Sequence, residues 1–314
     1  REGEEREIRI EYCRSNPFLA GVRVGALLPV PEDLIDQAAA AAAEADAAVV
    51  VVGLDNKWEG EGGDRVDVEL PGRQAELVEK VAAANPNTVV VVNAGSVVAM
   101  DWVDRVAAVL QLWYPGQEMG NALADVLFGD ANPSGRLPTT FPKRIEDNPA
   151  YLNYPGENGE VLYGEGIFVG YRYYDRKRIE PRFAFGHGLS YTSFSYGELR
   201  LDRDTMAMNG ELAASVEVTN AGERAGSEVV QLYLSDLECS LARPDQELKA
   251  FEKVALAPGE TKTVRFTLTP SALSFYDPAQ EGWVAEPGQF EVRIGASSRD
   301  IRARTRFELE GESS

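Results

Sequence analysis

Histidine, cysteine and basic side chains are scarce in this sequence, and each shortage argues against a class of function. The single histidine, His187, makes a zinc site or a Ser-His-Asp triad improbable. The two cysteines, Cys13 and Cys239, stand far apart and give neither metal-ligand spacing nor a disulfide framework. With 31 Lys and Arg against 51 Asp and Glu, the net charge of −20 argues against binding to nucleic acid or to an anionic membrane.

Long apolar runs are missing too. No stretch of the sequence reaches the roughly 18 apolar residues of a membrane span, so we expect no membrane insertion. The two unpaired cysteines slightly favour a reducing compartment such as the cytoplasm, although the compartment stays undecided.

The chain does have enough apolar residues to build hydrophobic cores, since its 314 residues are 44% hydrophobic and include 12 Tyr and 12 Phe. This length fits two domains.

Residues 29–162 show apolar strands that alternate with helices. We expect strands at 47–53, 88–93 and 107–113, and helices at 31–45, 71–84 and 118–128. Continuous apolar, β-branched strands of this kind are typical of a parallel sheet whose strands are buried on both faces. The sequence therefore predicts an α/β sandwich, a mostly parallel sheet with helices on both faces.

The remaining segments differ in character. Residues 194–314 hold about seven short alternating strands separated by turn residues, which predicts an all-β sandwich. Residues 163–193 form an aromatic linker that we expect to pack along other domains. Residues 1–28 hold two strands that must pair with strands from elsewhere.

The loop after the strand at 47–53 is the main candidate for chemistry. At about seventeen residues it exceeds the roughly 12–15 residues beyond which loops are usually functional or disordered. It follows the carboxyl end of a strand, where open α/β sheets bind ligands. It combines Trp58 with Glu59, Glu61 and several aspartates, and glycines flank Glu61. An indole ring near a flexible carboxyl group suits sugar binding and proton transfer to a glycosidic oxygen.

Other interpretations of these residues stay open. On spacing alone, the acidic side chains are more simply explained as solvated or paired with Lys57, Arg65 and Arg73. A dinucleotide loop is disfavoured because the G-x-G-x-x-G arrangement is missing. The segment 93–96 favours a structural turn over a phosphate site, since no lysine follows it. His187 favours packing among aromatic side chains over a role as a base.

Several motifs together resemble glycoside hydrolase family 3. Residues 53–74 have the form W-E-x-E-G-x-D-R…L-P-x-x-Q of that family's catalytic-acid loop. Further motifs follow in the same order, at residues 112–120 with 124–129, 132–138 with 140–142, 163–174 and 183–194. Residues 230–234, 243–244, 248–251 and 258–260 are similar to the family's fibronectin type III-like domain. Residues 1–28 resemble the closing strands of the protective-antigen-like β-sandwich that some members carry as an insert.

The resemblance implies a division of labour among the residues of the loop. Glu61 would be the general acid/base, with Glu59 as the runner-up because this loop varies in length among relatives. Asp64 and Arg65 would brace the loop, and Trp58 would line the sugar site or simply pack. No metal or cofactor is implied.

The resemblance also implies a second catalytic residue, a nucleophile, that is not among these 314 residues. The family's nucleophile is an aspartate on a TIM-like barrel, and nothing in this sequence has the pattern of such a barrel. We therefore expect this chain to be the C-terminal portion of a retaining β-glucosidase, acting on a β-glucoside or oligosaccharide together with an N-terminal barrel. The alternatives are a non-catalytic carbohydrate-binding or scaffold fragment, and a nucleotide-binding domain. A homo-oligomer is left open.

Overall fold

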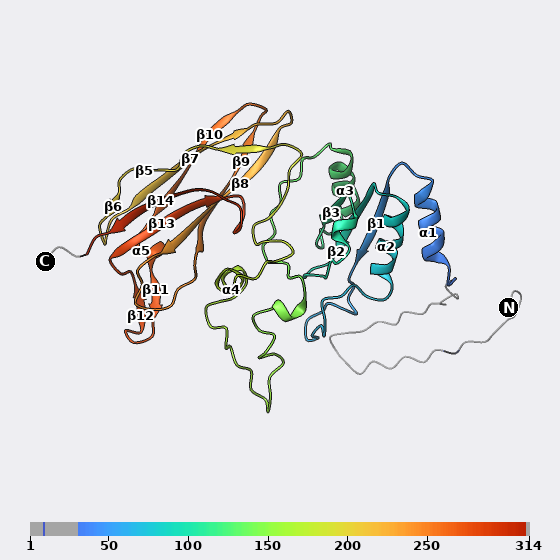
Figure 1. The fold of residues 1–314 in the computed structure, drawn as a ribbon, viewed down its shortest axis with the longest axis horizontal. Coiled ribbons are helices and arrows are strands. Elements are labelled where there is room, and N and C mark those ends of the chain that lie inside the picture. The colour runs from blue at the N-terminus through green and yellow to red at the C-terminus, as the bar shows by residue number, and fades with distance from the viewer. Residues whose placement is uncertain (1–8, 10–30, 312–314) are drawn as a thin grey trace, which may run out of the picture.

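The computed structural model describes Arg9 and residues 31–311, which form two domains joined by an extended aromatic segment (Figure 1). The strands expected within residues 1–28 lie outside the described residues, as does Cys13. None of the helices in the described part of the chain is long and apolar enough to span a bilayer.

The first domain is built on a parallel sheet with the strand order β1-β2-β3. Its elements are β1 (Ala48–Gly53), β2 (Thr88–Asn93), β3 (Ala108–Gln111), α1 (Leu34–Ala43), α2 (Gln74–Ala84), α3 (Met119–Phe128) and the short 3₁₀ helix η1 (Val103–Arg105). Helices α1 and α2 lie together on one side of the strands, and α3 lies on the other (Figure 1). The expected α/β sandwich is therefore confirmed.

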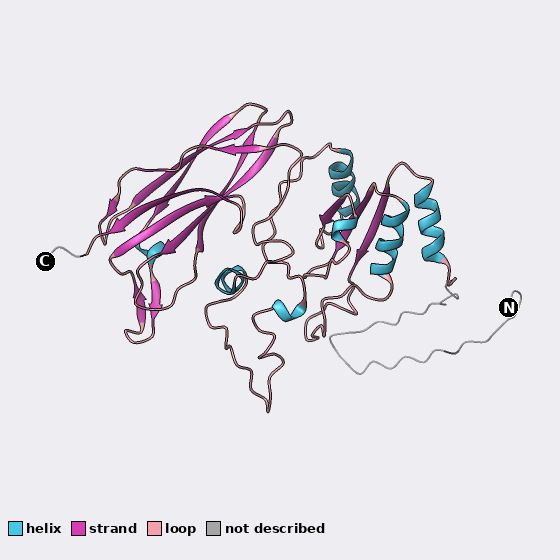
Figure 2. Ribbon diagram, viewed as in Figure 1, coloured by secondary structure: helices cyan, strands magenta, loops and turns pink. Residues whose placement is uncertain are grey.

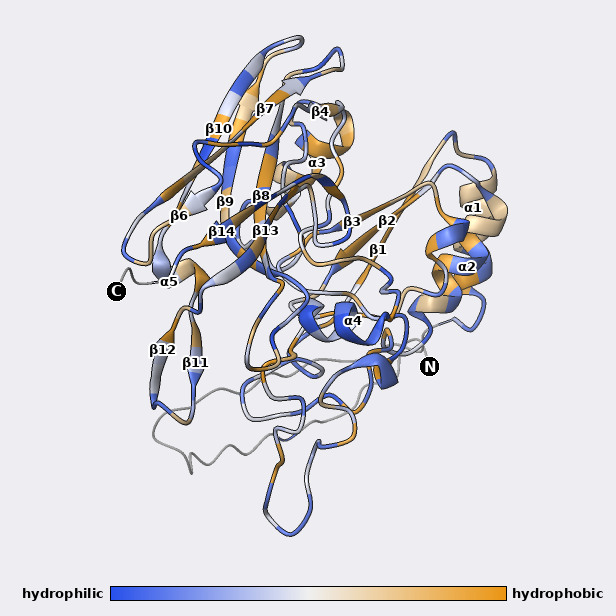
Figure 3. Ribbon diagram, turned by 60° about the vertical axis from the view of Figure 1, so that its left-hand side comes forward, coloured by the Kyte–Doolittle hydropathy of each residue, from blue (hydrophilic) through white to orange (hydrophobic). Residues whose placement is uncertain are grey.

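Burial differs between the strands of this sheet. Strand β2 is enclosed as expected, since Val90, Val91 and Val92 are all fully buried. Strand β1 is not, because Val49 and Val51 remain 50% and 58% exposed (the apolar strands are coloured orange in Figure 3). The prediction that this strand is buried on both faces is wrong for the described residues. The strand lies at the edge of the sheet, and α2 packs on only one of its faces.

The segment 129–193 is mostly loop, with the short helices η2 (Ile145–Asp147) and α4 (Tyr171–Lys177) (Figure 2). Some of its aromatic side chains pack on the two domains, as predicted. Tyr171 stacks on Phe185 with 4.8 Å between ring centroids, and its hydroxyl accepts a hydrogen bond from Leu248 N–H in the second domain. Phe183 packs edge-on against Phe141, which belongs to the core of the first domain.

The second domain is a sandwich of two sheets. One has the order β10-β7-β4 with β5 also paired to β7, and the other has the order β6-β14-β13-β8-β9. The strands are β4 (Phe194–Tyr196), β5 (Arg200–Leu201), β6 (Thr205–Met206), β7 (Leu212–Asn220), β8 (Gly226–Asp236), β9 (Glu247–Leu256), β10 (Thr261–Leu268), β13 (Gly288–Gly295) and β14 (Ile301–Leu309). Alternate residues face inward: Leu212, Ala214, Val216 and Val218 of β7 are buried. The all-β sandwich is confirmed.

Three features of the second domain lie outside a simple antiparallel sandwich. Strand β12 (Gly282–Val284) pairs with β11 (Phe275–Asp277) in a hairpin outside both sheets. The short helix α5 (Pro270–Leu273) precedes this hairpin. Strand β6 runs parallel to β14. None of these features changes the sandwich core.

A buried ion pair ties the aromatic segment to the second domain. Arg136 lies 2.7 Å from Glu228 at the start of β8, and their side chains are only 8% and 6% exposed. A charge pair this deeply buried is strongly destabilised when one partner is removed. The position of the second domain along the segment is therefore specified by particular side chains.

Candidate active site

The candidate loop leaves the sheet at Gly53, the last residue of β1, and a side chain would not fit there. A Cβ atom built on Gly53 would lie 1.9 Å from the backbone oxygen of Asn93 at the end of β2. This close approach lets Leu54 N–H donate to the Asn93 oxygen at 3.0 Å. The sequence of the strand end thus fixes where the loop starts.

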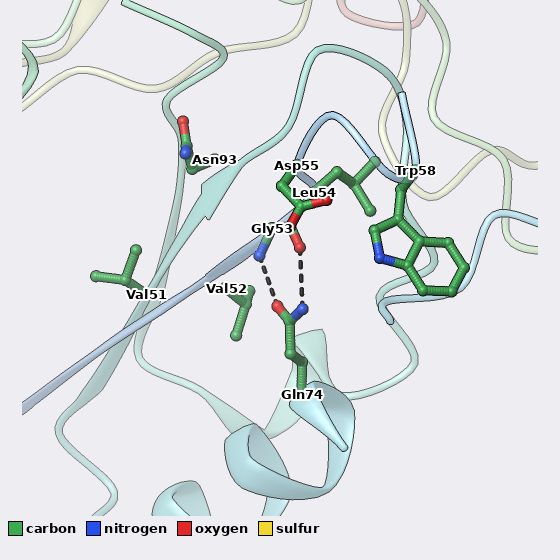
Figure 4. A pocket seen from close by; sticks show the side chains of 8 residues that line it. All are labelled: Val51, Val52, Gly53, Leu54, Asp55, Trp58, Gln74 and Asn93. Atoms are coloured by element: carbon green, nitrogen blue, oxygen red, sulfur yellow. Dashed lines mark hydrogen bonds between the residues drawn. The ribbon is translucent and has the colours of Figure 1, made fainter. Parts of the chain in front are cut away.

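The two ends of the loop are joined by Gln74, the first residue of α2. Its side-chain amide receives the Gly53 N–H at 2.7 Å and donates to the Gly53 oxygen at 3.0 Å (Figure 4). The amide therefore satisfies both backbone groups of Gly53, as a neighbouring strand would. This clamp holds the end of β1 against the beginning of α2.

Glu59 anchors the middle of the loop to the carboxyl ends of the other two strands. Its carboxylate accepts hydrogen bonds from the Gly95 N–H at 2.9 Å and from the hydroxyls of Ser96 and Tyr114. Gly95 and Ser96 follow β2, while Tyr114 follows β3. Arg65 extends the network, since it donates to Ser96 Oγ at 2.9 Å and to the Val97 oxygen at 2.8 Å.

The electrostatics of Glu59 favour its ionised form. Partial burial by itself would raise the pKa of Glu59, but the hydrogen bonds from Ser96, Tyr114 and Gly95 N–H outweigh it. Arg65 adds to the effect, and the pKa of Glu59 is lowered. A carboxylate held by three donors is a structural anchor, whereas a general acid must hold a proton when the substrate arrives.

Glu61 lies two residues further along in a different environment. It is exposed in a tight turn in which Gly63 N–H donates to the Gly60 oxygen. Gly62 has a φ of +81°, a conformation that favours glycine. No hydrogen bond or ion pair joins the Glu61 carboxylate to another described residue. The structure therefore separates the two glutamates, one anchored and one presented outward.

Trp58 lines a shallow pocket of about 260 Å³ at the ends of β1 and β2. Its ring is 47% exposed, and the neighbouring wall contains Leu54, Asp55, Gln74 and Asn93 (Figure 4). Glu61 is not among the residues that line this pocket. In the described part of the chain, no cluster of His, Cys, Asp or Glu side chains is arranged to hold a metal ion.

Of the side chains around Glu59, Ser96 and Tyr114 were not predicted from the sequence, whereas Arg65 was expected to brace the loop. Ser96 belongs to the segment 93–96, for which a turn was favoured, and its hydroxyl bridges Glu59 and Arg65. Tyr114 follows Trp113, whose φ of +59° is unusual for a residue other than glycine. A backbone outlier of this kind marks a turn that its surroundings determine. The motif at residues 112–120 includes Tyr114, but nothing in it shows that Tyr114 reaches Glu59.

His187 packs as expected. Its ring stacks on Phe183 with 5.5 Å between ring centroids and an interplanar angle of 17°. Burial lowers the pKa of His187, and nearby Arg136 lowers it further. The lowered pKa favours the neutral form of His187, which packs within the aromatic segment.

Both domains of the chain match known families. Residues 6–171 match the glycosyl hydrolase family 3 C-terminal domain, and residues 228–298 match a fibronectin type III-like domain. "Thermostable beta-glucosidase B" of Acetivibrio thermocellus is 51% identical over 272 residues, which are 87% of this chain and 36% of that protein. A "Beta-glucosidase" of Rhizobium radiobacter is 47% identical over 309 residues, 96% of this chain and 38% of that protein.

The solved structures that resemble this chain are also beta-glucosidases. The crystal structure of a beta-glucosidase from Kluyveromyces marxianus in complex with glucose superposes with a TM-score of 0.87 at 44% identity, covering 91% of this chain and 34% of that one. A family 3 beta-glucosidase from Bifidobacterium adolescentis gives a TM-score of 0.86 at 39% identity, covering 92% and 43%. These 314 residues thus span somewhat over a third of the length of the relatives that they match.

Proposed function

Because this chain belongs to glycosyl hydrolase family 3, we propose that it forms the acid/base portion of a retaining β-glucosidase that releases terminal β-D-glucose. The observation that carries the proposal is the contrast within one loop. Glu59 is fixed by three hydrogen-bond donors, and Glu61, two residues away, is exposed between glycines. The names of the relatives, which are beta-glucosidases, support the choice of substrate.

In this proposal Glu61 transfers one proton in each half of the reaction. A nucleophilic carboxylate attacks the anomeric carbon, and Glu61 gives its proton to the departing glycosidic oxygen as that bond breaks. Glu61 then takes a proton from the water that attacks the glycosyl-enzyme ester. The sugar leaves with a hydroxyl group, and both carboxyl groups return to their starting states.

The nucleophile in this proposal is an aspartate on a barrel outside these 314 residues. Retaining enzymes place the two carboxyl groups about 5–5.5 Å apart. The turn that carries Glu61 points outward rather than into the pocket beside Trp58, and this supports a site completed by another part of the protein. Trp58 would contribute an exposed indole for stacking on a sugar ring.

Azide rescue distinguishes the two glutamates. In the full-length protein that contains these residues, Glu61→Ala should lower activity on an activated aryl glucoside by at least a hundredfold. Azide should restore turnover and yield the β-glucosyl azide, because this anion attacks the anomeric carbon of the glycosyl-enzyme in place of water, releases the enzyme carboxylate and needs no general base. Glu59→Ala is the matched control and should show no azide rescue. Unchanged activity in Glu61→Ala, or rescue in Glu59→Ala, would reject the assignment.

The second candidate, a non-catalytic sugar-binding fragment, is favoured by one observation. The pocket beside Trp58 contains a single carboxyl group, that of Asp55, among its lining residues. This candidate predicts that glucose or gluconolactone raises the melting temperature of the isolated chain without any turnover. Stabilisation by nucleotides and not by glucose would instead favour a nucleotide-binding domain.

A further inference from the structure

The side chain of Glu61 has no support of its own, so its position depends on the backbone that carries it. No hydrogen bond or ion pair joins its carboxylate to another described residue. Residues 60, 62 and 63 around it are all glycine, the residue with the greatest conformational freedom to lose on ordering. A residue that transfers a proton must lie within hydrogen-bond reach of the reacting oxygen. Something outside residues 60–63 must therefore hold this turn in place.

The hydroxyl group of Ser96 joins the two ends of this turn. It donates a hydrogen bond to the carboxylate of Glu59, which precedes the turn. It also accepts a hydrogen bond of 2.9 Å from the guanidinium of Arg65, which follows the turn. Ser96 comes shortly after β2, the central strand of the sheet. Both ends of the turn are therefore tied through one side chain to the carboxyl end of a buried strand.

Tyr114 holds the first end of the turn from a different strand, since it follows β3. Its hydroxyl donates to the carboxylate of Glu59 and lies 3.2 Å from the backbone oxygen of Leu54, where the loop begins. A phenol has one proton to donate, and a charged carboxylate is the stronger acceptor. Burial and the hydrogen bond to Glu59 raise the pKa of Tyr114, which keeps this proton on the phenol.

The space around these contacts has no room for a side chain at residue 95. A Cβ atom built on Gly95 would lie 2.7 Å from Cε2 of Tyr114 and 3.3 Å from Oε2 of Glu59. The Gly95 N–H at the same time donates to Glu59 at 2.9 Å. A methyl group at this position would push Tyr114 and Glu59 aside without removing any hydrogen-bonding group. Gly95 therefore offers a purely steric way to disturb the anchor of the turn.

We propose that Ser96 and Tyr114 are positioning residues for proton transfer, because they hold the glycine turn where Glu61 reaches the departing glycosidic oxygen. This inference rests on the proposed function, in which Glu61 is the general acid. Ser96 and Tyr114 act through Glu59 and Arg65 and give no proton to the substrate themselves. A catalytic group displaced by about 1 Å can lose about a hundredfold in rate, so a loosened anchor has a measurable cost.

The test compares two leaving groups in the full-length protein that contains these residues. An alkyl alcohol needs a proton from the general acid to depart, whereas dinitrophenolate is a stable anion and does not. Ser96→Ala and Tyr114→Phe should each lower kcat/KM about tenfold for an alkyl β-glucoside and less than about twofold for dinitrophenyl β-glucoside. Gly95→Ala should show the same selective loss, because it displaces Tyr114 and Glu59.

Ser274→Ala and Tyr191→Phe are the matched controls. Each removes a hydroxyl that donates to a backbone oxygen away from the loop, that of Pro270 or of Val126, and should leave both values of kcat/KM unchanged. Equal losses on the two substrates in Ser96→Ala and Tyr114→Phe would show a general disturbance and overturn the proposal, as would no loss on either. Tyr114 is 51% exposed and loses a single oxygen atom, so its variant decides the question even if Ser96→Ala does not fold.

Glu61→Ala separates this inference from the proposed function. If Glu61 is the general acid, this variant should show the largest selective loss on the alkyl glucoside. A selective loss in Glu61→Ala without one in the Ser96 and Tyr114 variants would reject the positioning role alone. No selective loss in Glu61→Ala would reject the proposed function, and this inference with it.

Discussion

Glu59 and Glu61 show how two identical side chains acquire different roles from their neighbours. Glu59 receives hydrogen bonds from residues that follow two different strands, whereas Glu61 lies in an exposed glycine turn. Hydrogen bonds to the charged form stabilise a carboxylate, and this lowers its pKa. The loop thus has one glutamate that holds it on the sheet and another that is exposed to solvent.

Glu59→Gln should destabilise the chain by about 1–3 kcal/mol, because its donors would lose their charged acceptor. The lowered pKa also determines how the stabilising contribution of Glu59 changes with pH. The contribution of Glu59 is present above the unfolded pKa of about 4.3 and is lost as the pH falls through the lower, folded value. Urea unfolding of both proteins at pH 7 and at pH 4 measures the effect. Glu61→Gln should stay within about 0.5 kcal/mol of the parent.

His187 also makes the unfolding free energy depend on pH, in a direction set by its lowered pKa. Burial and Arg136 lower its pKa in the folded chain, while Asp300 opposes the shift. As the pH falls, His187 is therefore protonated in the unfolded chain before it is protonated in the folded chain. Its contribution to the unfolding free energy is complete above about pH 6.5 and is lost as the pH falls toward the folded pKa. His187→Phe should flatten the fall in unfolding free energy between pH 7 and 5, by up to about 1.4 kcal/mol per pH unit. Parallel curves for the two proteins would contradict this.

At the scale of elements, the end of β1 is specified by a contact that permits no side chain. A Cβ on Gly53 would lie 1.9 Å from the Asn93 oxygen, and this obstacle is rigid backbone. Gly53→Ala should therefore lower the unfolding free energy by about 3 kcal/mol or more, through a forced separation of β1 from β2. The Gln74 clamp, which depends on the position of Gly53, should loosen with it.

Gly120 in α3 provides the control for Gly53. A Cβ on Gly120 would meet nothing within 4 Å, and its backbone is helical. Gly120→Ala should stabilise the chain by about 0.5–1 kcal/mol through the helix propensity of alanine. Urea unfolding of both variants tests the pair, and destabilisation of similar size in each would show that the contact at Gly53 is not the cause.

At the scale of the whole molecule, a buried ion pair fixes the segment between the two domains on the second domain. Arg136→Met would leave Glu228 buried without its partner and should lower the unfolding free energy by about 3–5 kcal/mol. The double variant Arg136→Met/Glu228→Leu should recover most of that loss, because no unpaired charge remains. Urea titrations of the parent and of both variants give the comparison. A loss below about 1 kcal/mol in the single variant would mean that the pair is well solvated.

The order of strands and helices could be predicted because periodicity is a local property. The strand at 88–93 was expected and forms over the same residues as β2, and β7, β10 and β14 show the alternating burial expected of the second domain. The family motifs are local as well, and they identified the loop that contains Glu59 and Glu61. The outer face of β1 was missed because burial on a second face depends on another element that covers it.

By itself, the sequence determined the two domain classes, the family and the loop where a proton-transfer residue is expected. Only the tertiary structure decided which glutamate is anchored, since the donors to Glu59 lie 36 to 55 residues away in the chain. It also decided that Leu152, Leu162 and Tyr163 are exposed while Tyr171 and Phe183 are packed. The physical reason is the same in both cases. Composition and spacing report what a residue can do, and its partners are set by contacts between distant segments.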